Sequence, residues 1–559
     1  MRQNSDQIPL STSLNIFPAQ KIKKQSLVNK RVLYLSLQAI LNAIVIGFVA
    51  RLLVYLIDLI TNLAFYGKFS IEPASPARNG LGLAVIFIPV AGSIIVGFIA
   101  RYGSKAIRGH GIPEAMEKII LDDSKIPPSI TFLKPLSAAI SIGTGGPFGA
   151  EGPIIATGGA FGSFTGQIMH ISASERKIIL SAGACAGMSA IFGSPLAAVL
   201  LAIELLLFEF SPKSIIPVAL ACVTGAAMHL LLFGSSPVFA MSAIPVASGG
   251  SLIIYAAMGL VIGVIASLIS KSVYAVEDAF EKLPIHWMWW PAIGAIAVGI
   301  VGYFAPFTMG VGYENIQHLL SGKLPLTLLI SLCFLKYISW VISLGSGTSG
   351  GTLAPLFTIG GALGALLGVA LLNMFPSLQI NLATAALIGM AAMFAGASRA
   401  LLTSIVFALE TTGQSNGLLP LLAACAAAYF VSFFMMKGSI MTEKIQRRGV
   451  STPDEYEADL LKHARAKDLI TVAADNDYNG LPFVYATDDL SFCMEVMGRY
   501  ETDAVAVVSN TPDQKIMGKL TSSAIVKHYS RQKELQHSYN SPKHIKRLLV
   551  RGRRIMNKA

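Results

Sequence analysis

Residues 149–153 of this chain are Gly-Ala-Glu-Gly-Pro, and Glu151 is the only charged side chain between Ile140 and Ile171. A lone carboxylate in so apolar a segment is costly, and such residues usually mark an ion pathway, a proton relay or a counter-charge. The flanking glycines allow a sharp backbone turn, and Pro153 suits the first turn of a helix. A helix that begins here directs free N–H groups and the positive end of its dipole at whatever precedes it. The stretch predicts an anion site with a competing carboxylate; a helix-capping glutamate at a membrane surface is the alternative.

The pattern occurs twice in the chain. Residues 149–162 and 351–364 share glycine, proline and alanine at identical spacing, and residues 183–204 and 389–410 both lead from a glycine to an Ala-x-Glu triplet. Two pairs in the same order predict a duplicated membrane unit, with a transport site between its halves near the bilayer midplane. The second copy has Leu353 where the first has its glutamate, so the carboxylate is not needed to fold the repeat.

Composition places the chain in a membrane. It has 559 residues, 53% of them hydrophobic and 13% charged. Apolar runs that predict membrane spans occur at Leu81–Ala100, Leu252–Ile269, Ala292–Ala305 and Leu418–Met436; the third is short for a span, which predicts a tilted or partly buried helix. Other segments are interrupted by glycine, proline or charges, at Ile112–Leu121, Pro128–Ile142 and Leu353–Leu371. These predict re-entrant or half-spanning helices, which occur only where protein or a water-filled cavity shields the backbone. A soluble protein is excluded.

Basic residues at both ends predict the orientation. Lys and Arg crowd residues 21–31, before the first long apolar segment, and Arg447 and Arg448 follow the last one, so we expect both termini to be cytoplasmic. The N-terminus lacks the features of a cleavable signal peptide, and we expect a multi-pass protein of a bacterial inner membrane. The stretch Lys543–Lys558 holds seven Lys and Arg and no acid. It predicts contact with anionic lipid rather than nucleic acid, or a solvated tail without a partner.

The motifs in this chain resemble those of the CLC family of chloride channels and chloride/proton antiporters. Residues 109–113 (Gly-His-Gly-Ile-Pro) resemble the family's G-S-G-I-P, residues 149–153 its G-[K/R]-E-G-P, and residues 351–355 (Gly-Thr-Leu-Ala-Pro) its G-x-F-x-P. The triplet 439–441 lies where the family usually has a tyrosine, and the resemblance covers about residues 32–448. It implies an all-α polytopic membrane protein, built as an inverted repeat with re-entrant half-helices. It also implies a homodimer with one pore in each subunit.

The resemblance also implies the residues of the site. In this family the glutamate of G-x-E-G-P is the gate, and that role falls on Glu151. The implied partner is chloride or a similar small anion, held by helix N-termini and their N–H groups. The anion-binding positions carried over from the family are His110, Gly111, Ile112, Gly152, Thr352, Leu353 and Met441.

Several of these positions depart from the family pattern. His110 replaces a serine whose hydroxyl coordinates the central anion, and Met441 replaces a tyrosine hydroxyl on the other side. Both side-chain hydroxyl ligands are therefore absent, which leaves the backbone amides. Leu353 replaces a phenylalanine that binds through its N–H, which is a mild exchange. Ala150 replaces a basic residue and weakens the local positive potential.

The expected proton pathway departs as well. The family's paired internal glutamates fall on Glu204 and Leu205, and the second of the pair is the proton acceptor in antiporters. Because leucine cannot relay a proton, we expect channel-like, passive chloride conduction. A chloride/proton antiporter with weak or atypical coupling is the alternative, with Glu204 as its candidate proton carrier. Glu410, the counterpart of Glu204 in the repeat, is interpreted as a packing or capping residue.

Nothing in the sequence predicts a cofactor or a metal site, and the case for an enzyme is weak. The cysteines lack metal or redox spacing and are interpreted mainly as small packing residues; they are Cys185, Cys222, Cys333, Cys425 and Cys493. Residues 347–350 fit the G-x-S-G pattern of rhomboid proteases, which would make Ser349 a nucleophile that needs a histidine base. No histidine lies in Leu353–Glu410, where the partner helix would follow.

We divide the chain into four parts. They are an N-terminal arm (1–31), a transmembrane domain (32–448, with halves 32–230 and 250–448 joined by the linker Phe233–Ser251), a C-terminal module (449–532) and a basic tail (533–559). In the module, residues 502–508 and 516–520 predict strands and residues 521–529 a helix.

This small α+β module resembles one incomplete CBS motif, roughly Ala464–Gln532. The aspartate that holds a nucleotide ribose in such modules is replaced by Ala524, so we expect a structural or dimer-contact role.

Overall fold

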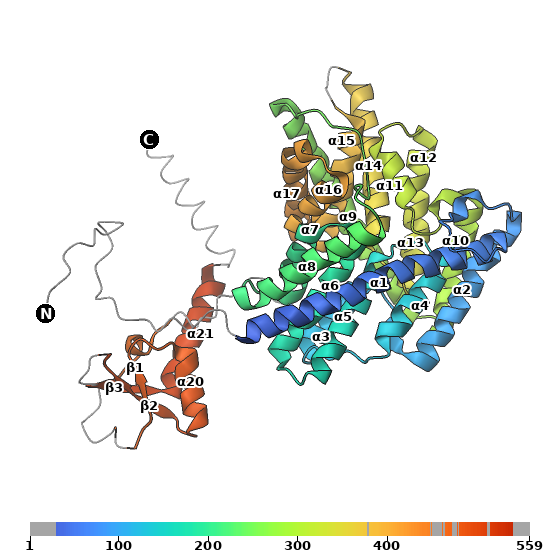
Figure 1. Ribbon diagram of the computed structural model, residues 1–559. Coiled ribbons are helices and arrows are strands. Elements are labelled where there is room, and N and C mark those ends of the chain that lie inside the picture. The colour runs from blue at the N-terminus through green and yellow to red at the C-terminus, as the bar shows by residue number, and fades with distance from the viewer. Residues whose placement is uncertain are drawn as a thin grey trace, which may run out of the picture. The chain divides into compact units, whose positions relative to one another are not determined.

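The computed structural model describes residues 30–376, 380–447, 449, 461, 464–471, 478, 480–510 and 515–539. The chain divides into two compact units, Met1–Thr452 and Pro453–Ala559, which are called here the membrane unit and the C-terminal module (Figure 1). The described part of the membrane unit contains helices and no strand, whereas the module contains a small sheet. Most of the predicted N-terminal arm and the end of the predicted basic tail lie outside the described residues.

The membrane unit is a succession of helices of very different lengths. Its first half contains α1 (Lys30–Tyr66), α2 (Phe87–Phe98), α3 (Ile112–Leu121), α4 (Ile130–Gly143), α5 (Glu151–Ile168), α6 (Ala173–Phe192), α7 (Pro195–Leu201) and α8 (Pro212–Leu232). Its second half contains α9 (Gly249–Glu281), α10 (Trp290–Phe304), α11 (Tyr313–Leu320), α12 (Leu326–Ile330), α13 (Lys336–Gly345), α14 (Leu353–Met374), α15 (Leu382–Ser398), α16 (Leu401–Thr412), α17 (Leu418–Met435) and α18 (Glu443–Arg447). Three π-helical turns extend α2, α7 and α12: η3 (Ile99–Gly103), η5 (Ala202–Leu207) and η8 (Ser331–Leu335).

Eight of the described helices are long and apolar enough to cross a membrane. The four apolar runs predicted to span coincide with Gly82–Gly103, Gly249–Glu281, Trp287–Phe304 and Ser415–Met435. The longest helix, α1, runs for 37 residues and leaves Leu37, Phe48 and Leu52 more than half exposed. Large apolar side chains exposed on so long a helix are suited to lipid, because a soluble protein rarely leaves wide apolar patches uncovered.

The interrupted segments give two short helices and one long one. The helices α3 and α4 have 10 and 14 residues and are short, as predicted. The helix α14, which was predicted to be re-entrant or half-spanning because the segment is rich in glycine, has 22 residues, enough to cross a bilayer. Its glycines do not break the helix, because they serve to let a neighbouring helix approach.

Glycine pairs hold the equivalent helices of each half together. A Cβ atom built on Gly183 of α6 would lie 2.3 Å from the carbonyl oxygen of Gly158 in α5. In the second half, a Cβ atom on Gly389 of α15 would lie 2.2 Å from the carbonyl oxygen of Gly360 in α14. The two backbones therefore touch where no side chain fits, at the same position of both copies. Such small-residue contacts are typical of packing between membrane helices.

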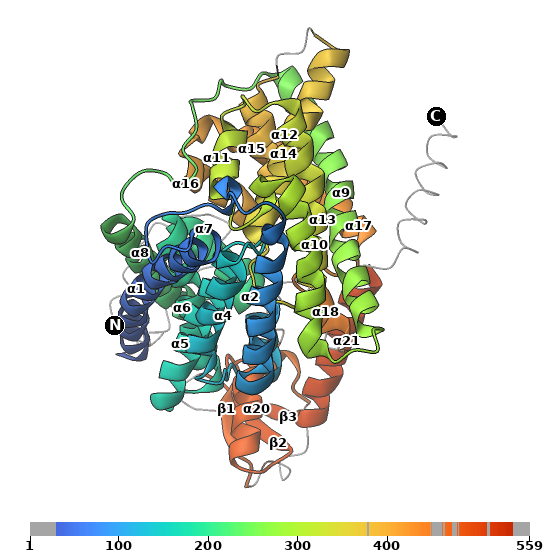
Figure 2. The same cartoon turned by 90° about the vertical axis from the view of Figure 1, so that its right-hand side faces the viewer.

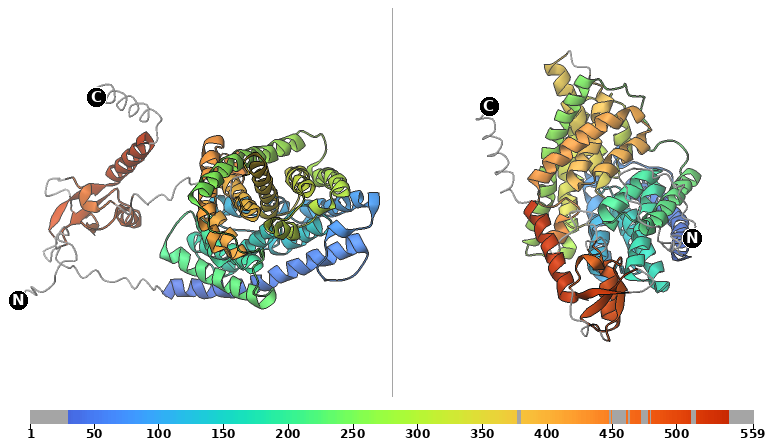
Figure 3. Two further views of the ribbon diagram at one scale, coloured as in Figure 1. Left: turned by 90° about the horizontal axis from the view of Figure 1, so that it is seen from above. Right: turned by 90° about the vertical axis from the view of Figure 1, so that its left-hand side faces the viewer.

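The two halves occupy different sides of the membrane unit and also interlock. Helices coloured blue to green mostly lie on one side and those coloured yellow to orange on the other (Figures 1 and 2). Within the first half, α1 lies along α8 (Figure 3). Across the halves, α2 packs against α10 and α7 against α16. The segment 233–248, which joins α8 to α9, contains no helix or strand.

The C-terminal module is the small α+β unit predicted from the sequence. Its strands β1 (Phe483–Tyr485), β2 (Ala504–Val508) and β3 (Ile516–Thr521) form one sheet in that order, with β1 and β2 parallel and β2 and β3 antiparallel. The helices are α20 (Leu490–Arg499) and α21 (Ser522–Tyr539). Val505 and Val507 of the central strand are fully buried and form a core with Cys493 and Leu520.

The glycine contacts predict that alanine substitutions at two adjacent positions, 158 and 159, affect the stability of the protein differently. Replacing Gly158 by alanine forces α5 and α6 apart and should destabilise the protein by about 1–3 kcal/mol. Replacing Gly159 is the matched control, because a Cβ atom there meets only side-chain atoms at 3.5 Å or more. Thermal unfolding of the detergent-solubilised protein, followed by tryptophan fluorescence, should show a lower midpoint for Gly158→Ala alone. Equal midpoints for the two variants would contradict this packing argument.

Candidate functional site

Four helices of the membrane unit begin at one place, because backbone hydrogen bonds join the loops that precede them. The helices are α3 and α5 of the first half and α11 and α14 of the second. The bonds, donor first, are Gly109 N–H to Thr348 O (3.0 Å), Gly350 N–H to Gly109 O (3.4 Å), Gly351 N–H to Gly149 O (3.1 Å) and Gly310 N–H to Gly145 O (3.1 Å). The positive ends of several helix dipoles therefore meet in the interior, where they favour an anion.

Glycines make this meeting sterically possible. A Cβ atom on Gly152 would lie 2.3 Å from the carbonyl oxygen of His110 and 2.8 Å from the Cα atom of Gly351. A Cβ atom on Gly111 would lie 2.3 Å from the carbonyl oxygen of Gly152, and Gly111 also has a φ of +96°, which other residues rarely adopt. The predicted site residues Gly111 and Gly152 are thus the points at which three loops touch.

Glu151 is the first residue of α5, and its side chain is fully buried. The N–H of Ala354, in the first turn of α14, donates a hydrogen bond of 2.6 Å to its Oε1 atom. The hydroxyl of Tyr313, the first residue of α11, donates one of 3.2 Å to Oε2. The carboxylate therefore occupies the position at the N-terminus of α14 where a dissolved anion would find its N–H groups.

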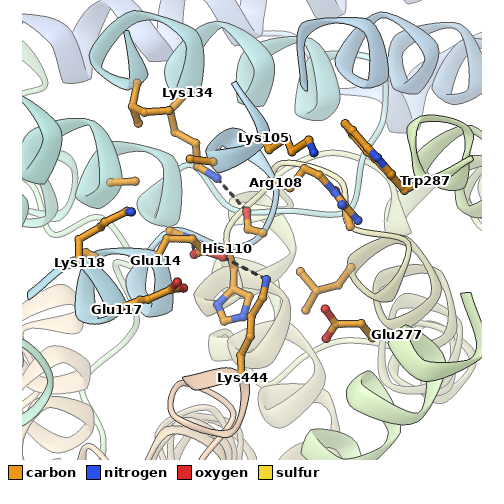
Figure 4. A pocket seen from close by; sticks show the side chains of 18 of the residues that line it. Lys105, Arg108, His110, Glu114, Glu117, Lys118, Lys134, Glu277, Trp287 and Lys444 are labelled. Atoms are coloured by element: carbon orange, nitrogen blue, oxygen red, sulfur yellow. Dashed lines mark hydrogen bonds and ion pairs between the residues drawn. The ribbon is translucent and has the colours of Figure 1, made fainter. Parts of the chain in front are cut away.

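His110 lies at a cavity of about 470 Å³, called here the His110 cavity. Lys134, Lys444 and Glu114 also line the cavity and are grouped around the imidazole in Figure 4. The ring is 5% exposed, and no described residue forms a hydrogen bond with its buried Nδ1 atom. Arg108 donates to Gly347 O (3.2 Å) and stacks on Trp287 at another wall of the cavity.

The start of α3 is capped by its own glutamate. The N–H of Gly111 donates a hydrogen bond of 2.6 Å to Oε2 of Glu114, which also lies 3.5 Å from the ammonium of Lys444. This amide is therefore engaged within the protein. Ile112, the next residue, is buried.

A buried hydroxyl lies at the start of α14. Thr352 precedes the helix, and its hydroxyl is buried without a hydrogen-bond partner among the described residues. Leu353, the first residue of the helix, is fully buried. A hydroxyl next to free helix N–H groups is a further potential donor to an anion.

Met441 is fully buried in the loop before α18, and its N–H donates to Ser439 Oγ (3.2 Å). The preceding residue is fixed from two sides, because Ile440 N–H donates to Ala397 O (2.9 Å) and Tyr274 donates its hydroxyl to Ile440 O (2.7 Å). Tyr274 lines the His110 cavity, so this loop lies at the cavity wall.

Two buried lysines hold equivalent loops in the two halves. Lys134 of α4 donates hydrogen bonds of 2.7 and 2.8 Å to the carbonyl oxygens of Ile107 and Gly109, just before α3. Lys336 of α13 donates bonds of 2.9 and 3.0 Å to those of Thr308 and Gly310, just before α11. Both ammonium groups are buried, and their hydrogen bonds make this burial tolerable. They fix the loops and add positive charge near the helix starts.

Glu204 and Glu410 are equivalent in the repeat, and each caps a helix of the other half. The carboxylate of Glu204 accepts hydrogen bonds from the N–H groups of Leu402 and Thr403 at the start of α16, both 2.9 Å. The carboxylate of Glu410 accepts bonds of 3.0 and 2.8 Å from the N–H groups of Leu196 and Ala197 at the start of α7. The capping role predicted for Glu410 therefore also describes the contacts of Glu204, and Glu204 is not among the described residues that line the His110 cavity.

Ser349 is part of the loop junction. It is fully buried, its hydroxyl accepts a hydrogen bond of 3.2 Å from that of Ser137, and its backbone forms a bridge with Gly109. These contacts give the serine a structural place beside the start of α14.

Sequence reasoning missed Tyr313, Lys336 and the unpartnered hydroxyl of Thr352. A signal existed for Lys336, because a charge inside an apolar segment is costly and rarely without function. For Tyr313 the signal was its place after Gly312, since residues 310–313 correspond in the repeat to residues 109–112.

The arrangement of these helices is enough to define a class of protein. A duplicated set of membrane helices, whose N-termini converge on a buried site between the halves, is the architecture of a transport protein. The comparisons give the family: the voltage-gated chloride channel family matches residues 91–433, more than half of the chain. The chain belongs to this family, the CLC family predicted from its motifs. It is an integral membrane protein for anion transport rather than an enzyme in the usual sense.

Relatives and solved structures agree with this assignment. The chain is 25% identical over 368 residues to a putative ClcB-like chloride channel protein of Ralstonia nicotianae, covering 65% of this chain and 86% of that protein. It is 29% identical over 351 residues to the H⁺/Cl⁻ exchange transporter ClcA of Yersinia pestis, covering 60% and 72%. The structure of a slow cyanobacterial Cl⁻/H⁺ antiporter matches with a TM-score of 0.65 and 23% identity, covering 74% of this chain and 98% of that one. A CLC-type fluoride/proton antiporter matches with a TM-score of 0.59 and 21% identity, covering 74% and 98%.

Proposed function

We propose that this protein conducts chloride or a similar small anion passively across the membrane, and that Glu151 is its gate. One observation carries the proposal: a fully buried carboxylate accepts a hydrogen bond from the first turn of α14, where helix N-termini converge. An ionised side chain in that position competes directly with a dissolved anion for the same N–H groups. When the carboxylate is protonated or displaced, it no longer competes for these N–H groups, and the position becomes available to the anion.

The same site supports the remaining predicted anion contacts. The amides around Gly152, Thr352 and Leu353 lie at or beside helix starts, and backbone N–H groups hold an anion without a full positive charge, so the anion can still leave. The Nδ1 atom of His110 and the hydroxyl of Thr352 are buried without a partner among the described residues, and we propose that these groups replace the two hydroxyls of the family pattern. Ile112 and Met441 then contribute shape rather than polar contacts, and the N–H of Gly111 serves the cap of α3.

We favour a channel-like protein over a coupled antiporter because Leu205 stands at the expected proton-acceptor position. The contacts of Glu204 support this view, since its carboxylate serves as the cap of α16. The relatives named as H⁺/Cl⁻ exchangers keep the second candidate function open, namely a chloride/proton antiporter with atypical coupling. In that case Glu204 or the carboxylates around the His110 cavity would carry the proton.

The other sequence predictions extend this proposal. We propose a homodimer in a bacterial inner membrane with both termini in the cytoplasm, and the His110 cavity as the cytoplasmic entrance. The positive-inside tendency supports the orientation, since Arg447 at the end of α18 and Lys105 and Lys118 at the cavity would all lie on the cytoplasmic side. We also propose that the chain is divided into an arm, two repeat halves, a CBS-like module and a basic tail. The proposed partner of the tail is anionic lipid.

Glutamine in place of Glu151 mimics the protonated gate. We expect Glu151→Gln protein in liposomes to release chloride at least as fast as wild type and to lose the pH dependence of release that comes from the gate, because the amide carries no charge that competes with the anion. Chloride efflux measured over a series of pH values tests this. Abolished efflux from a variant that still folds and elutes like wild type would rule out the gate.

His110 gives the site a second response to pH. A protonated imidazole attracts a dehydrated anion far more strongly than a neutral one, so chloride affinity should rise as the pH falls. The charged groups around the ring are Glu114 of α3, Lys134 of α4 and Lys444 near the start of α18, and all three remain unchanged in the test. Calorimetric chloride binding in the Glu151→Gln background should lose its remaining pH dependence on His110→Ser. Equal pH dependence with His110 and with serine would show that the histidine is a spacer.

Proton coupling distinguishes the two candidate functions. Liposomes with separate chloride and pH gradients should show a reversal potential set by chloride alone, as expected of a channel. The variant Glu204→Gln should leave that potential unchanged but lower the thermal midpoint, because a weakened helix cap costs about 1 kcal/mol. A reversal potential that follows the pH gradient in wild type would instead establish the antiporter, and its loss in Glu204→Gln would make Glu204 the proton carrier.

A further inference from the structure

We propose that Tyr313 is the positioning residue of the gate: its hydroxyl holds the ionised carboxylate of Glu151 in the closed position. The inference rests on the proposed gating role of Glu151 and adds a residue from the other half of the repeat. The contact is direct, since the hydroxyl of Tyr313 donates a hydrogen bond of 3.2 Å to Oε2 while Ala354 N–H binds Oε1. The two oxygens of the carboxylate thus have separate donors, from α11 and from α14.

The position of Tyr313 is determined by its backbone. It is the first residue of α11 and follows Gly312, which has a φ of +77°. The loop before it is fixed by Lys336, which binds the carbonyl oxygens of Thr308 and Gly310, and by the bond from Gly310 N–H to Gly145 O, just before α5. The loop that carries the tyrosine is therefore tied to the loop that precedes the glutamate.

The ring of Tyr313 is held by aromatic neighbours. Phe192 and Phe239 contact it edge-on, with ring centroids 5.8 and 5.7 Å away, and both phenylalanines are buried. Phe192 in turn packs on Phe407 at 4.9 Å. This aromatic wall restricts the ring to one position, so little conformational entropy is lost when the hydroxyl meets the carboxylate. An apolar surrounding also strengthens the hydrogen bond relative to water.

Tyr313 lies where the buried gate meets accessible surface. Glu151 is fully buried, whereas Tyr313 is half-buried. In the repeat, the start of α11 corresponds to the start of α3, where His110 meets the His110 cavity. The polar side chain stands at a different position in each half: His110 corresponds to Val311, and Tyr313 corresponds to Ile112. The phenol faces the carboxylate, to which a hydroxyl can only donate.

This hydrogen bond favours the ionised form of Glu151 over the protonated form, because a carboxylate is the stronger acceptor. Three further groups influence the same equilibrium: the N–H groups of Leu353 and Ala354 at the start of α14, and the ammonium of Lys336 on α13, which interacts electrostatically with Glu151. None of them is altered by removing the phenol oxygen. A hydrogen bond to a charged group corresponds to a factor of about ten in an equilibrium.

The test is the pH profile of chloride efflux from liposomes that contain Tyr313→Phe. Loss of the hydroxyl makes the gate easier to protonate, so the pH of half-maximal efflux should rise by about one unit. At neutral pH, efflux should increase up to about ten-fold. The matched control is Tyr66→Phe, because Tyr66 is also half-buried and its hydroxyl donates to a backbone oxygen, Ser75 O at 2.6 Å, away from the gate. Its profile should coincide with that of wild type.

Two more variants make the result decisive. In the Glu151→Gln background, Tyr313→Phe should leave the pH profile unchanged, because the side chain that the phenol holds can no longer ionise. Site-specific incorporation of difluorotyrosine at position 313 keeps the shape and makes the hydroxyl a stronger donor, so the half-maximal pH should fall; this variant also serves if phenylalanine impairs folding. A wild-type profile for Tyr313→Phe, or an equal shift in Tyr66→Phe, would overturn the role of Tyr313 alone. A Glu151→Gln protein that keeps the wild-type profile would overturn the gate and the role of Tyr313 together.

Discussion

The structure depends on one constraint: the starts of several helices must meet in the interior of the membrane unit without leaving backbone groups unsatisfied. The loops before α3, α5, α11 and α14 solve this by hydrogen bonding to one another, from Gly109 to Thr348 and from Gly351 to Gly149. Irregular backbone is tolerated at membrane depth only where protein surrounds it. Glycine is required at Gly111 and Gly152 because any side chain there would meet a carbonyl oxygen of the neighbouring loop.

The charged residues at this junction follow the repeat only in part: each half has a buried lysine, but the buried glutamate of the first half is not repeated in the second. Lys134 and Lys336 each bind two carbonyl oxygens of the loop before a short helix, α3 in the first half and α11 in the second. Glu151 has no counterpart in the second half, where Leu353 takes its place. This asymmetry suits the proposed gate, because the single carboxylate would close the path, and the uncharged copy leaves the N–H of Ala354 in α14 available to bind it.

The departures from the family pattern at His110, Leu353 and Met441 are exchanges of side chains, and the backbone hydrogen bonds that join the loops do not involve those side chains. Among the described residues, the buried Nδ1 atom of His110 and the hydroxyl of Thr352 lack a hydrogen-bond partner, and we propose that they take the place of the missing serine and tyrosine hydroxyls. Glu204 was a candidate proton carrier, but its contacts are those of a helix cap. Glu410 makes the equivalent contacts in the other half of the repeat. A duplicated fold allows such changes, because each half supports the other.

The sequence by itself determined the membrane class, the family, the duplication and the lone carboxylate, because these depend on local composition and on spacing along the chain. The short helices α3 and α4 were also predictable, whereas the length of α14 was not, since glycine at a helix contact and glycine at a helix break look alike in sequence. Only the tertiary structure decided which residues meet. Tyr313 lies 162 positions from the glutamate whose carboxylate it binds. The caps of Glu204 and Glu410 likewise join distant helices, because hydrogen bonds depend on proximity in space, which no local pattern records.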